Sequence, residues 1–202
     1  MGKVILDISM SVDGFVAGPN DTPEQPLGNG GGAIQNWLFS GEQPSRYNTF
    51  FKLSETNKQV FEGSIPSTGA MIVGRRTYDI VNGWGGSHPI EGVPVFVVTN
   101  KAPEHYLEEK TPFIFVKEGV ISAVNQAKGI AGDKNVSIGT ASIASQCIRA
   151  GLIDEMHLHV APVLLGKGTR LFDQIGPEQL KLESKQVIDG SDVVHLTYKI
   201  LY

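Results

Sequence analysis

Short apolar runs alternate with amphipathic segments through the middle of this 202-residue chain, and the alternation restricts the possible folds more than any other feature. The strand-like runs are residues 69–74, 93–100, 112–117 and 135–139, and the helix-like segments between them are residues 75–84, 119–129 and 140–150. A helix between two strands returns the chain to the same end of the sheet, so such strands pair in parallel. The pattern therefore predicts an α/β fold.

Strands at both ends of the chain extend the predicted sheet. Residues 3–14, "KVILDISMSVDG", form a first strand that ends at an Asp-Gly turn signal. Two long strands are expected at residues 181–188 and 192–201. Asp189-Gly190 between these apolar alternations is typical of a β-hairpin, which is antiparallel. We therefore predict a single domain over residues 1–202 with a mixed, mostly parallel sheet.

The segment between the first strand and the middle of the chain is harder to assign. Residues 18–41 are rich in Gly, Pro and Asn, and we predict a long loop with one short helix around "IQNWL". Loops of this length are often functional lids. The residues from Ser45 to Phe61 are predicted to be helical. The helix at 140–150 should close on Gly151 as its cap.

The composition excludes several classes of protein. Hydrophobic residues make up 41% and charged residues 19%, which is ordinary for a soluble globular protein. The net charge of -4 argues against a general nucleic-acid or membrane-surface binder. The single cysteine fits a reducing compartment, and the N-terminus is too short and polar for a signal peptide. No run approaches the length of a membrane helix, so we predict a cytoplasmic protein.

Three strand ends carry residues of a kind that holds nucleotides. They are Gly74, Arg75, Arg76 and Thr77 after the first run, Thr99, Asn100 and Lys101 after the second, and Gly139, Thr140, Ala141, Ser142 and Ile143 after the fourth. Glycine lets a ligand approach the backbone, arginine binds phosphate bidentately, and the N–H groups of a helix start attract anions. Ligands bind outside the carboxyl ends of open α/β sheets, so the three ends can converge on one phosphate-rich cofactor.

Each of these ends also has an explanation without a ligand. Thr77 or Thr140 can simply cap a helix, and two adjacent arginines can be a solvated surface. The occurrence of all three together favours the cofactor. Asp13 leaves a similar choice open, because an Asp-Gly pair is a common turn and a carboxylate there would also lie near a cofactor on the same rim.

Other suggestive motifs carry less weight. "GNGGGA" follows no strand, and "GKGT" lacks the upstream glycine of a phosphate-binding loop. His157 and His159 share one face of a strand, but a metal site needs a third ligand, so ordinary packed or surface histidines are favoured and no metal is predicted. Cys147 is most simply a small buried hydrophobe.

Several of these motifs, in this order, resemble the dihydrofolate reductase-like superfamily. They are "SVDGFVAG", "MIVGRRTYD", "VFVVTNK", "SIGTASIASQCIRAGLIDEMHLHVAPVLLGKGTRLF" and the closing hairpin. The greatest similarity is to the reductase domain of the bifunctional riboflavin-biosynthesis deaminase–reductase and to its stand-alone bacterial relatives. The resemblance covers nearly the whole chain except the loop from Pro19 to Gly41. It implies a three-layer α/β/α fold.

The resemblance also implies that NADPH lies across the strand ends. Gly74 to Thr77 would hold the pyrophosphate and 2′-phosphate, Thr99 to Lys101 would flank the adenosine, and Gly139 to Ile143 would seat the pyrophosphate on a helix N-terminus. Val16 and Ala17 would face the nicotinamide. The two adjacent arginines favour NADPH over NADH. Asp13 is the candidate for a polar contact or proton relay, supported by Ser11.

We therefore expect an NADPH-dependent reductase of a small heterocyclic or carbonyl substrate. A pteridine or a ribosylaminopyrimidine, as in riboflavin biosynthesis, is the expected class. The helix expected at Ser45–Phe61 has no carboxylate at the place where dihydrofolate reductase binds its pterin, which argues against a true folate reductase. A nucleotide-binding module without catalysis is the alternative. The resemblance also favours a homodimer.

Overall fold

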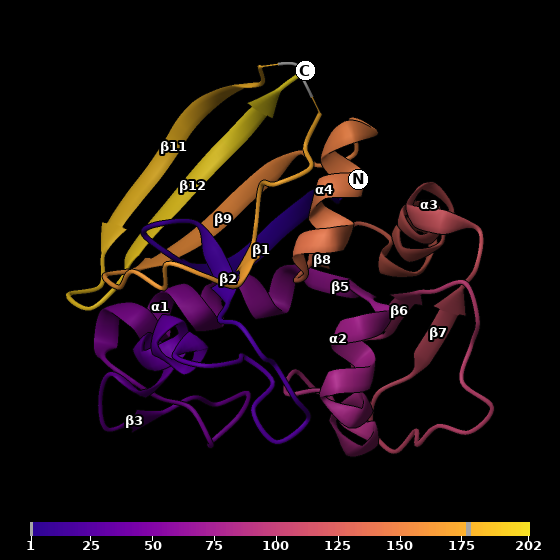
Figure 1. Ribbon diagram of the computed structural model, residues 1–202, viewed down its shortest axis with the longest axis horizontal. Helices are drawn as coiled ribbons and strands as arrows, with labels where there is room; N and C mark the ends of the chain where they lie inside the picture. Colours follow the sequence, from indigo (N-terminus) through magenta and orange to yellow (C-terminus); the bar gives the residue numbers. More distant parts are fainter. Residues whose placement is uncertain (1, 177–178) are drawn as a thin grey trace.

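An eight-stranded sheet forms the centre of the computed structural model, which describes residues 2–176 and 179–202. The strands are Val4–Ser11 (β1), Thr68–Gly74 (β5), Val95–Val98 (β6), Phe113–Val116 (β7), Asn135–Ile138 (β8), Glu155–Ala161 (β9), Lys181–Asp189 (β11) and Val194–Leu201 (β12). Their order across the sheet is β11-β12-β9-β1-β8-β5-β6-β7. Figure 1 shows the C-terminal hairpin at one edge and β7 at the other.

The sheet is mixed and mostly parallel, as predicted. The strands from β9 to β7 pair in parallel, whereas β12 pairs antiparallel with both β9 and β11. The last pair of the predicted hairpin is Asp189 with Val194. Two short ribbons lie outside the main sheet: Phe15–Ala17 (β2) pairs with Thr169–Arg170 (β10), and Gln43–Pro44 (β3) pairs with Lys52–Leu53 (β4).

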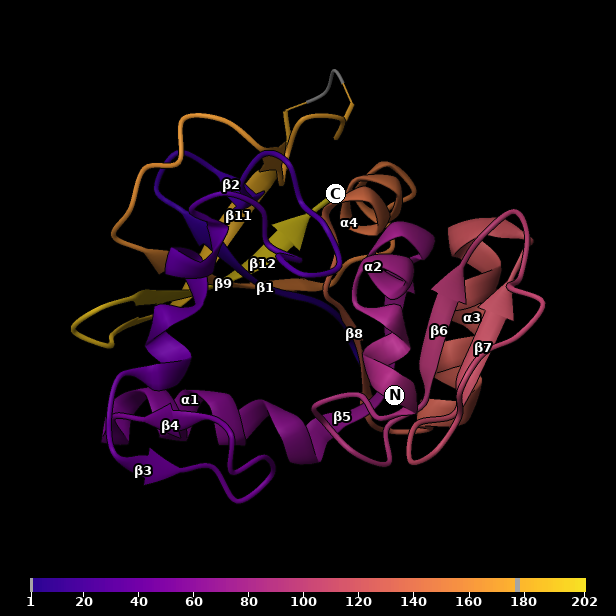
Figure 2. The ribbon, with the colours of Figure 1, turned by 60° about the horizontal axis from the view of Figure 1, so that its bottom comes forward.

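The helices lie on both faces of the sheet, which confirms the predicted three-layer α/β/α fold (Figures 1 and 2). They are Glu55–Ser64 (α1), Arg75–Ile80 (α2), Gly119–Ala131 (α3) and Ala141–Arg149 (α4), with shorter 3-10 helices at Gly31–Phe39 (η1), Ile65–Ser67 (η2) and Asn82–Gly86 (η3). None of the helices in the described residues is long and apolar enough to cross a membrane.

One face of the sheet carries the main hydrophobic core. Alternate residues of β1, β5, β8 and β9 point toward α3 and α4 and are almost completely buried there. The predicted helix face of Val120, Val124 and Ala127 lies in this core, as does Cys147. Burial of that thiol raises its pKa to about 12, so it is a packed side chain as predicted.

The other face is covered by α1, α2 and η1, and its packing is less continuous. Tyr78 of α2 packs over β6 and β7, while Trp37 and Leu38 of η1 pack with Leu53 and Val193 in a separate cluster. Between these two clusters the sheet surface is lined by polar side chains and opens into cavities. This face therefore offers room for a ligand against the sheet.

The predicted helix over Ser45–Phe61 is wrong in its first half. Residues 45–51 form turns that join β3 to β4, and the helix begins only after Ser54, whose side chain accepts a hydrogen bond from the backbone N–H of Asn57. Phe50 and Phe51 stack on Phe39 instead of lining a helix. The spacing of apolar residues predicts a helix here, but tertiary aromatic contacts and the β3–β4 ribbon determine the local structure.

Two smaller predictions agree with the structure. The loop after residue 18 contains one short helix, η1, which includes the "IQNWL" stretch. Helix α4 ends at Arg149 with Ala150 as its C-cap, and Gly151 follows with a φ of 64°, the left-handed conformation typical of the residue after a helix.

Candidate active site

A groove at the carboxyl ends of the parallel strands brings together half of the residues predicted to bind a cofactor. Its volume is about 470 Å³. The predicted residues that line it are Gly74, Arg75, Thr99, Asn100, Lys101, Ser142 and Ile143, and they are joined by Val98, Lys117, Gly119 and Gln146. The strand ends of β5 and β6 and the start of α4 thus converge on one surface, which we call the rim groove.

The junction between β8 and α4 explains how the rim groove keeps free N–H groups. The Thr140 hydroxyl accepts a hydrogen bond from the backbone N–H of Gly74 (3.2 Å) and makes no capping bond to α4. The first helical bond runs from the Ala144 N–H to the Thr140 carbonyl. The N–H groups of Ala141, Ser142 and Ile143 therefore precede the helical ladder, and those of Ser142 and Ile143 border the groove. Such a helix start attracts an anion.

The side chains at the rim groove add positive charge. Arg75, Lys101 and Lys117 line it, and its described lining residues include no carboxylate. Arg75 is held in place by Asp79, 2.7 Å from its Nε, and by the carbonyl of Lys101. The groove therefore suits a phosphate-bearing ligand in both charge and backbone geometry.

Not all predicted residues of this group lie in the rim groove. Arg76 is 74% exposed and forms a two-pronged contact with Asp21 of the long loop, at 2.5 and 3.2 Å. Thr77 lies in α2 and does not line the groove. Val16 and Ala17 lie in β2, where Ala17 pairs with Thr169 of β10. Their predicted contacts with the cofactor stay predictions.

Asp13 and Ser11 form a turn at the end of β1. The Ser11 hydroxyl donates to Asp13 Oδ1 (2.6 Å), and the backbone N–H groups of Leu165 and Gly166 donate to its two oxygens at 3.1 and 2.7 Å. The bond from Ser11 and those from the loop hold the pKa of Asp13 at about 2. These hydrogen bonds connect the end of β1 to the loop after β9, so Asp13 has a structural role. Its catalytic role stays a prediction.

Two adjoining cavities lie between α1, η1 and the open face of the sheet. Their volumes are about 360 and 330 Å³. Both are lined by Asp7, Val60, Ser64, Thr68, Ser137, His157 and His159, and we call the combined space the inner cavity. The long loop contributes Gln35, Trp37 and Leu38 of η1 to its wall. Its size suits a small organic molecule.

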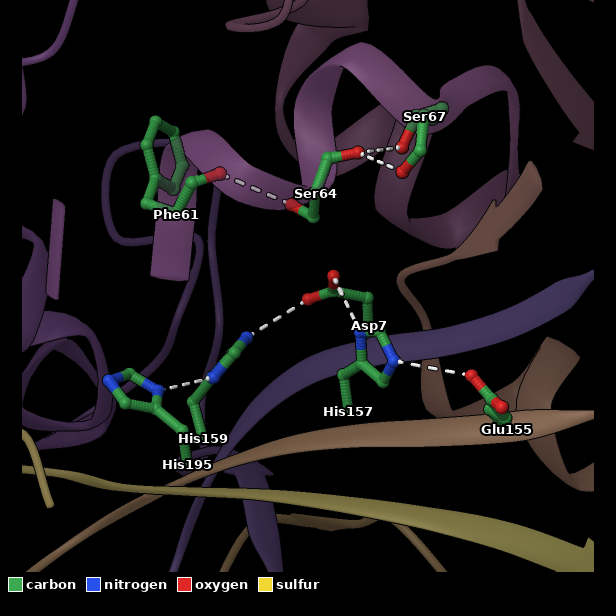
Figure 3. A network of polar contacts seen from close by, with 9 residues as sticks. Asp7, Phe61, Ser64, Ser67, Glu155, His157, His159 and His195 are labelled. Carbon is green, nitrogen blue, oxygen red and sulfur yellow. Dashed lines mark hydrogen bonds and ion pairs between the residues drawn. The ribbon is translucent and has the colours of Figure 1, made fainter. Parts of the chain in front are cut away.

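A linear hydrogen-bonded network runs along one side of the inner cavity (Figure 3). Asp7 Oδ1 lies 3.0 Å from His159 Nε2, and His159 Nδ1 lies 2.7 Å from His195 Nδ1. His195 Nε2 in turn lies 3.1 Å from Asn57 Oδ1 of α1. Figure 3 shows Phe61, Ser64 and Ser67 of the α1–η2 segment across from Asp7. We call Asp7, His159, His195 and Asn57 the relay.

Register explains why the relay residues meet. Asp7 pairs with His157 in the sheet, and Ser9 pairs with His159, so these side chains share one face of β1 and β9. His195 pairs with His159 across β12. Residues 7, 159 and 195 are far apart in sequence and become neighbours only through strand order. No motif spacing could have shown this.

The electrostatics of the relay are asymmetric. Burial opposes ionisation of Asp7, but hydrogen bonds from His157 and His159 outweigh it and hold the pKa of the carboxyl well below its usual range. Burial, with the charge of His159, lowers the pKa of His195 to about 4. At neutral pH Asp7 is therefore a carboxylate and His195 a neutral imidazole.

Aromatic side chains form the wall around the relay. The Trp37 ring centroid lies 4.8 Å from that of His159 and 5.1 Å from that of His195, and its indole N–H donates to Ser9 Oγ (2.9 Å). His88 lies elsewhere on the cavity wall, and burial lowers its pKa to about 4. Polar groups thus lie within an apolar enclosure, which is how ligand sites fix orientation.

Sequence reasoning missed most of the inner cavity. The alternation of His157 and His159 along a strand favours ordinary packed or surface histidines, and the signal that could have revealed the site is Asp7 inside an apolar strand. In the described part of the chain no group of three histidine, cysteine or carboxylate side chains is placed to hold a metal ion.

The rim groove and the inner cavity are both lined by residues near the end of β8. Gly139 and Ser137 line the inner cavity, and Ser142, three residues after Gly139, lines the rim groove. A ligand that lies in the groove with one end over Gly139 can therefore reach into the cavity. This arrangement is that of a cofactor site beside a substrate site.

Comparisons with known proteins place this geometry in a family. The sequence model of the RibD C-terminal domain matches residues 2–196. An uncharacterised protein of Bacillus subtilis, YwjB, is 28% identical over 198 residues, with 97% of each chain covered.

Two solved structures share the fold. One is a putative riboflavin biosynthesis protein from a Shewanella species, with a TM-score of 0.67, 24% identity and 99% of each chain covered. The other is a deaminase and 5-amino-6-(5-phosphoribosylamino)uracil reductase from Thermotoga maritima, with a TM-score of 0.60 and 15% identity. That alignment covers 99% of this chain and 57% of the Thermotoga protein.

Proposed function

This chain belongs to the RibD C-terminal domain family, and from that premise we propose that it is a reductase that transfers hydride from NADPH to a small heterocyclic or carbonyl substrate. The observation that carries the proposal lies at the end of β8, where Gly139 lines a polar cavity and Ser142, three residues later, lines a groove suited to an anion. A reductase of this kind needs both spaces side by side, because the cofactor and the substrate must touch.

The rim groove fits the phosphates of NADPH. The N–H groups at the start of α4 and the cations Arg75, Lys101 and Lys117 supply donors and charge. A side chain at Gly74 would come within 3.0 Å of Ser142 Oγ, so glycine keeps the groove open there. When bound, the reduced nicotinamide supplies the hydride, and the protein supplies orientation and charge. Arg76 would hold the 2′-phosphate after leaving Asp21.

The inner cavity favours a substrate without phosphate. Its described lining residues include four histidines, a carboxylate, serines, threonines and amides, but neither lysine nor arginine. The phosphate of a phosphoribosyl group would find no lysine or arginine among these lining residues to bind it bidentately or as a fixed cation, and burying it without such a partner is costly. Of the two substrate classes considered, an unphosphorylated pteridine-like heterocycle therefore fits this cavity better than a phosphoribosylaminopyrimidine.

The test is NADPH oxidation across a panel of candidate substrates. The panel holds oxidised pteridines, small aldehydes and ketones, and ribosylaminopyrimidines with and without phosphate. We expect turnover with at least one unphosphorylated heterocycle and weaker turnover with the phosphorylated compounds. Tight NADPH binding without oxidation by any member would favour the non-catalytic nucleotide-binding module instead.

A further inference from the structure

The orientation of the Asn57 amide determines which atoms donate and which accept in the hydrogen bonds of the relay. Its nitrogen lies 3.4 Å from the carbonyl of Trp37 and 2.9 Å from a carboxylate oxygen of Asp192, and both of these groups can only accept hydrogen bonds. The nitrogen must therefore face them, and the Asn57 oxygen must face His195. Since that oxygen can only accept, Nε2 of His195 carries a hydrogen and donates it (3.1 Å).

Because His195 donates from Nε2, the ring nitrogens of His159 and His195 that carry hydrogens can be assigned. A neutral imidazole carries one hydrogen, so neutral His195, protonated on Nε2, has a bare Nδ1. The 2.7 Å contact between the two Nδ1 atoms then requires that His159 donates from its Nδ1. His159 Nε2 still lies 3.0 Å from the Asp7 carboxylate, and that contact is a hydrogen bond only if a further proton lies between them.

The pair of Asp7 and His159 therefore holds one proton more than a carboxylate and a neutral imidazole. With Asp7 ionised, that proton lies on Nε2 of His159, and the ring is an imidazolium ion. Two other titratable side chains contact the pair directly: His157 on β9 and His195 on β12. Glu155 lies beside His157, Asp192 in the hairpin loop lies beside Asn57, and His88 lies on the cavity wall. The Trp37 ring also lies beside the His159 ring, with centroids 4.8 Å apart and planes tilted by 43°.

We propose that the Asp7–His159 pair is the proton donor of the reduction, with His195 and Asn57 as positioning residues that keep the proton on the cavity side. The proposal rests on the proposed function, since it needs a substrate in the inner cavity. Both Asp7 and His159 line that cavity, with the Asp7 side chain 26% exposed. An acid at this place lies within reach of a substrate atom.

The proposed step balances in atoms and charge. Hydride from NADPH adds to the carbon of a C=N or C=O bond, and the π pair moves to the nitrogen or oxygen. That atom takes a proton from the Asp7 carboxyl, which receives it from His159 Nε2 across their hydrogen bond. The products are NADP⁺, the reduced substrate, neutral His159 and the Asp7 carboxylate. His157, 3.8 Å from Asp7 Oδ2 and 25% exposed, provides a route for a proton to return from solvent.

Nitrogen-15 NMR of histidine-labelled protein tests the stored proton without any substrate. The chain has five histidines, and single His→Gln variants assign their signals. We expect His159 to carry hydrogens on both ring nitrogens at pH 7 and His195 to carry one, on Nε2. A His159 ring with a single hydrogen at pH 7 would overturn the proposal, and this result needs no variant.

Asp7→Asn then tests the donor role. The amide removes the negative charge, so His159 should lose its second proton at pH 7, and turnover should fall about 10²- to 10⁴-fold while the NADPH dissociation constant stays unchanged. The matched control is Asp173→Asn, the same change at a side chain that is 66% exposed, and it should alter neither. Turnover that survives Asp7→Asn would disprove the donor role.

These outcomes separate the inference from the function on which it rests. Wild-type protein that neither binds nor oxidises NADPH would refute the proposed function, whatever the histidine spectra show. Asn57→Leu removes the acceptor of His195, so the tautomer of His195 should shift in the spectra. An unchanged tautomer in that variant would refute the positioning role of Asn57.

Discussion

The rim groove and the inner cavity are built in different ways. The groove consists largely of backbone and of exposed cations, such as Lys101 with its 82% exposed side chain. The cavity consists of side chains from β1, β9, β12, α1 and η1, held by contacts that each depend on the next. Loss of one side chain should therefore reduce ligand affinity in the groove only moderately, whereas it should disturb the arrangement of several side chains in the cavity.

The difference follows from what each region must recognise. Phosphate oxygens accept hydrogen bonds from any well-placed N–H group, so a helix start and a few mobile cations suffice. A reacting double bond needs groups fixed within a fraction of an ångström, and these require packing and hydrogen bonds behind them. The relay and Trp37 provide this support in the cavity.

Trp37→Ala should produce the largest effect, because it removes a buried ring that packs on Phe61, His159 and His195. We expect a loss of about 3–5 kcal/mol in the free energy of unfolding, measured by urea denaturation. The control is Phe50→Ala, whose ring is 69% exposed and which should cost less than about 0.5 kcal/mol. Equal losses in the two variants would refute the view that the cavity wall depends on Trp37.

Acid should destabilise the protein through the cavity and not through the groove. His88 has an ordinary pKa of 6.5 when unfolded and about 4 when folded, and His195 behaves likewise. Between these values the unfolded chain binds more protons, so stability is full above about pH 6.5 and falls as the pH drops toward 4, by up to about 3 kcal/mol for His88. Asp13 adds a further loss below about pH 4, because its folded pKa is about 2.

Urea denaturation at pH 7, 5.5 and 4.5 measures this loss. His88→Gln should reduce the dependence on pH between 6.5 and 4, because the amide has no proton to gain. A dependence as steep in His88→Gln as in the wild type would show that the buried histidine is not its source.

Gly190→Ala should disturb the far end of the relay. A Cβ at this position would collide with Asn57 Oδ1 and come within 2.8 Å of Val193 Cγ1. We expect a loss of about 1–3 kcal/mol in the free energy of unfolding, with altered His195 signals in the NMR spectrum. Gly129→Ala in α3, where the added Cβ meets open space, should instead stabilise the protein by about 0.5–1 kcal/mol.

Arg76→Ala should have a smaller effect that is confined to the groove. If Arg76 exchanges Asp21 for the 2′-phosphate, its loss removes a charge-assisted contact and raises the NADPH dissociation constant about tenfold. Binding of NADH, which lacks that phosphate, should change less than about threefold. Calorimetric titration measures both, with Arg46→Ala as the control, since Arg46 pairs with Glu62 away from the groove. Equal losses for both cofactors would contradict the assignment.

The sequence allowed the groove to be predicted because its determinants are local. A buried strand that ends in Gly74 or Gly139 and continues directly into a helix is visible within a few residues. Helical periodicity identified α3 and α4, and Asp189-Gly190 identified the hairpin. Each of these signals depends on neighbours in sequence, which is why the fold and most of the groove could be predicted.

The inner cavity could not be predicted for the opposite reason. Asp7, His159 and His195 meet only because β9 lies between β1 and β12, and strand order is not encoded in local spacing. The false helix at residues 45–54 has a related cause, since Phe50 and Phe51 gain their contacts from Phe39, which is distant in sequence. Contacts between residues distant in sequence thus determine the relay and the structure of residues 45–54, which local sequence patterns do not specify.

The most direct test of NADPH binding by this protein is thermal unfolding in the presence of NADPH or NADH. At about one hundred times the dissociation constant, a ligand of the folded state adds about 2.7 kcal/mol, and each kcal/mol moves the midpoint by about 2–4 °C in a domain of this size. We expect a rise of several degrees with NADPH and a smaller rise with NADH. No shift with either nucleotide at millimolar concentration would contradict it.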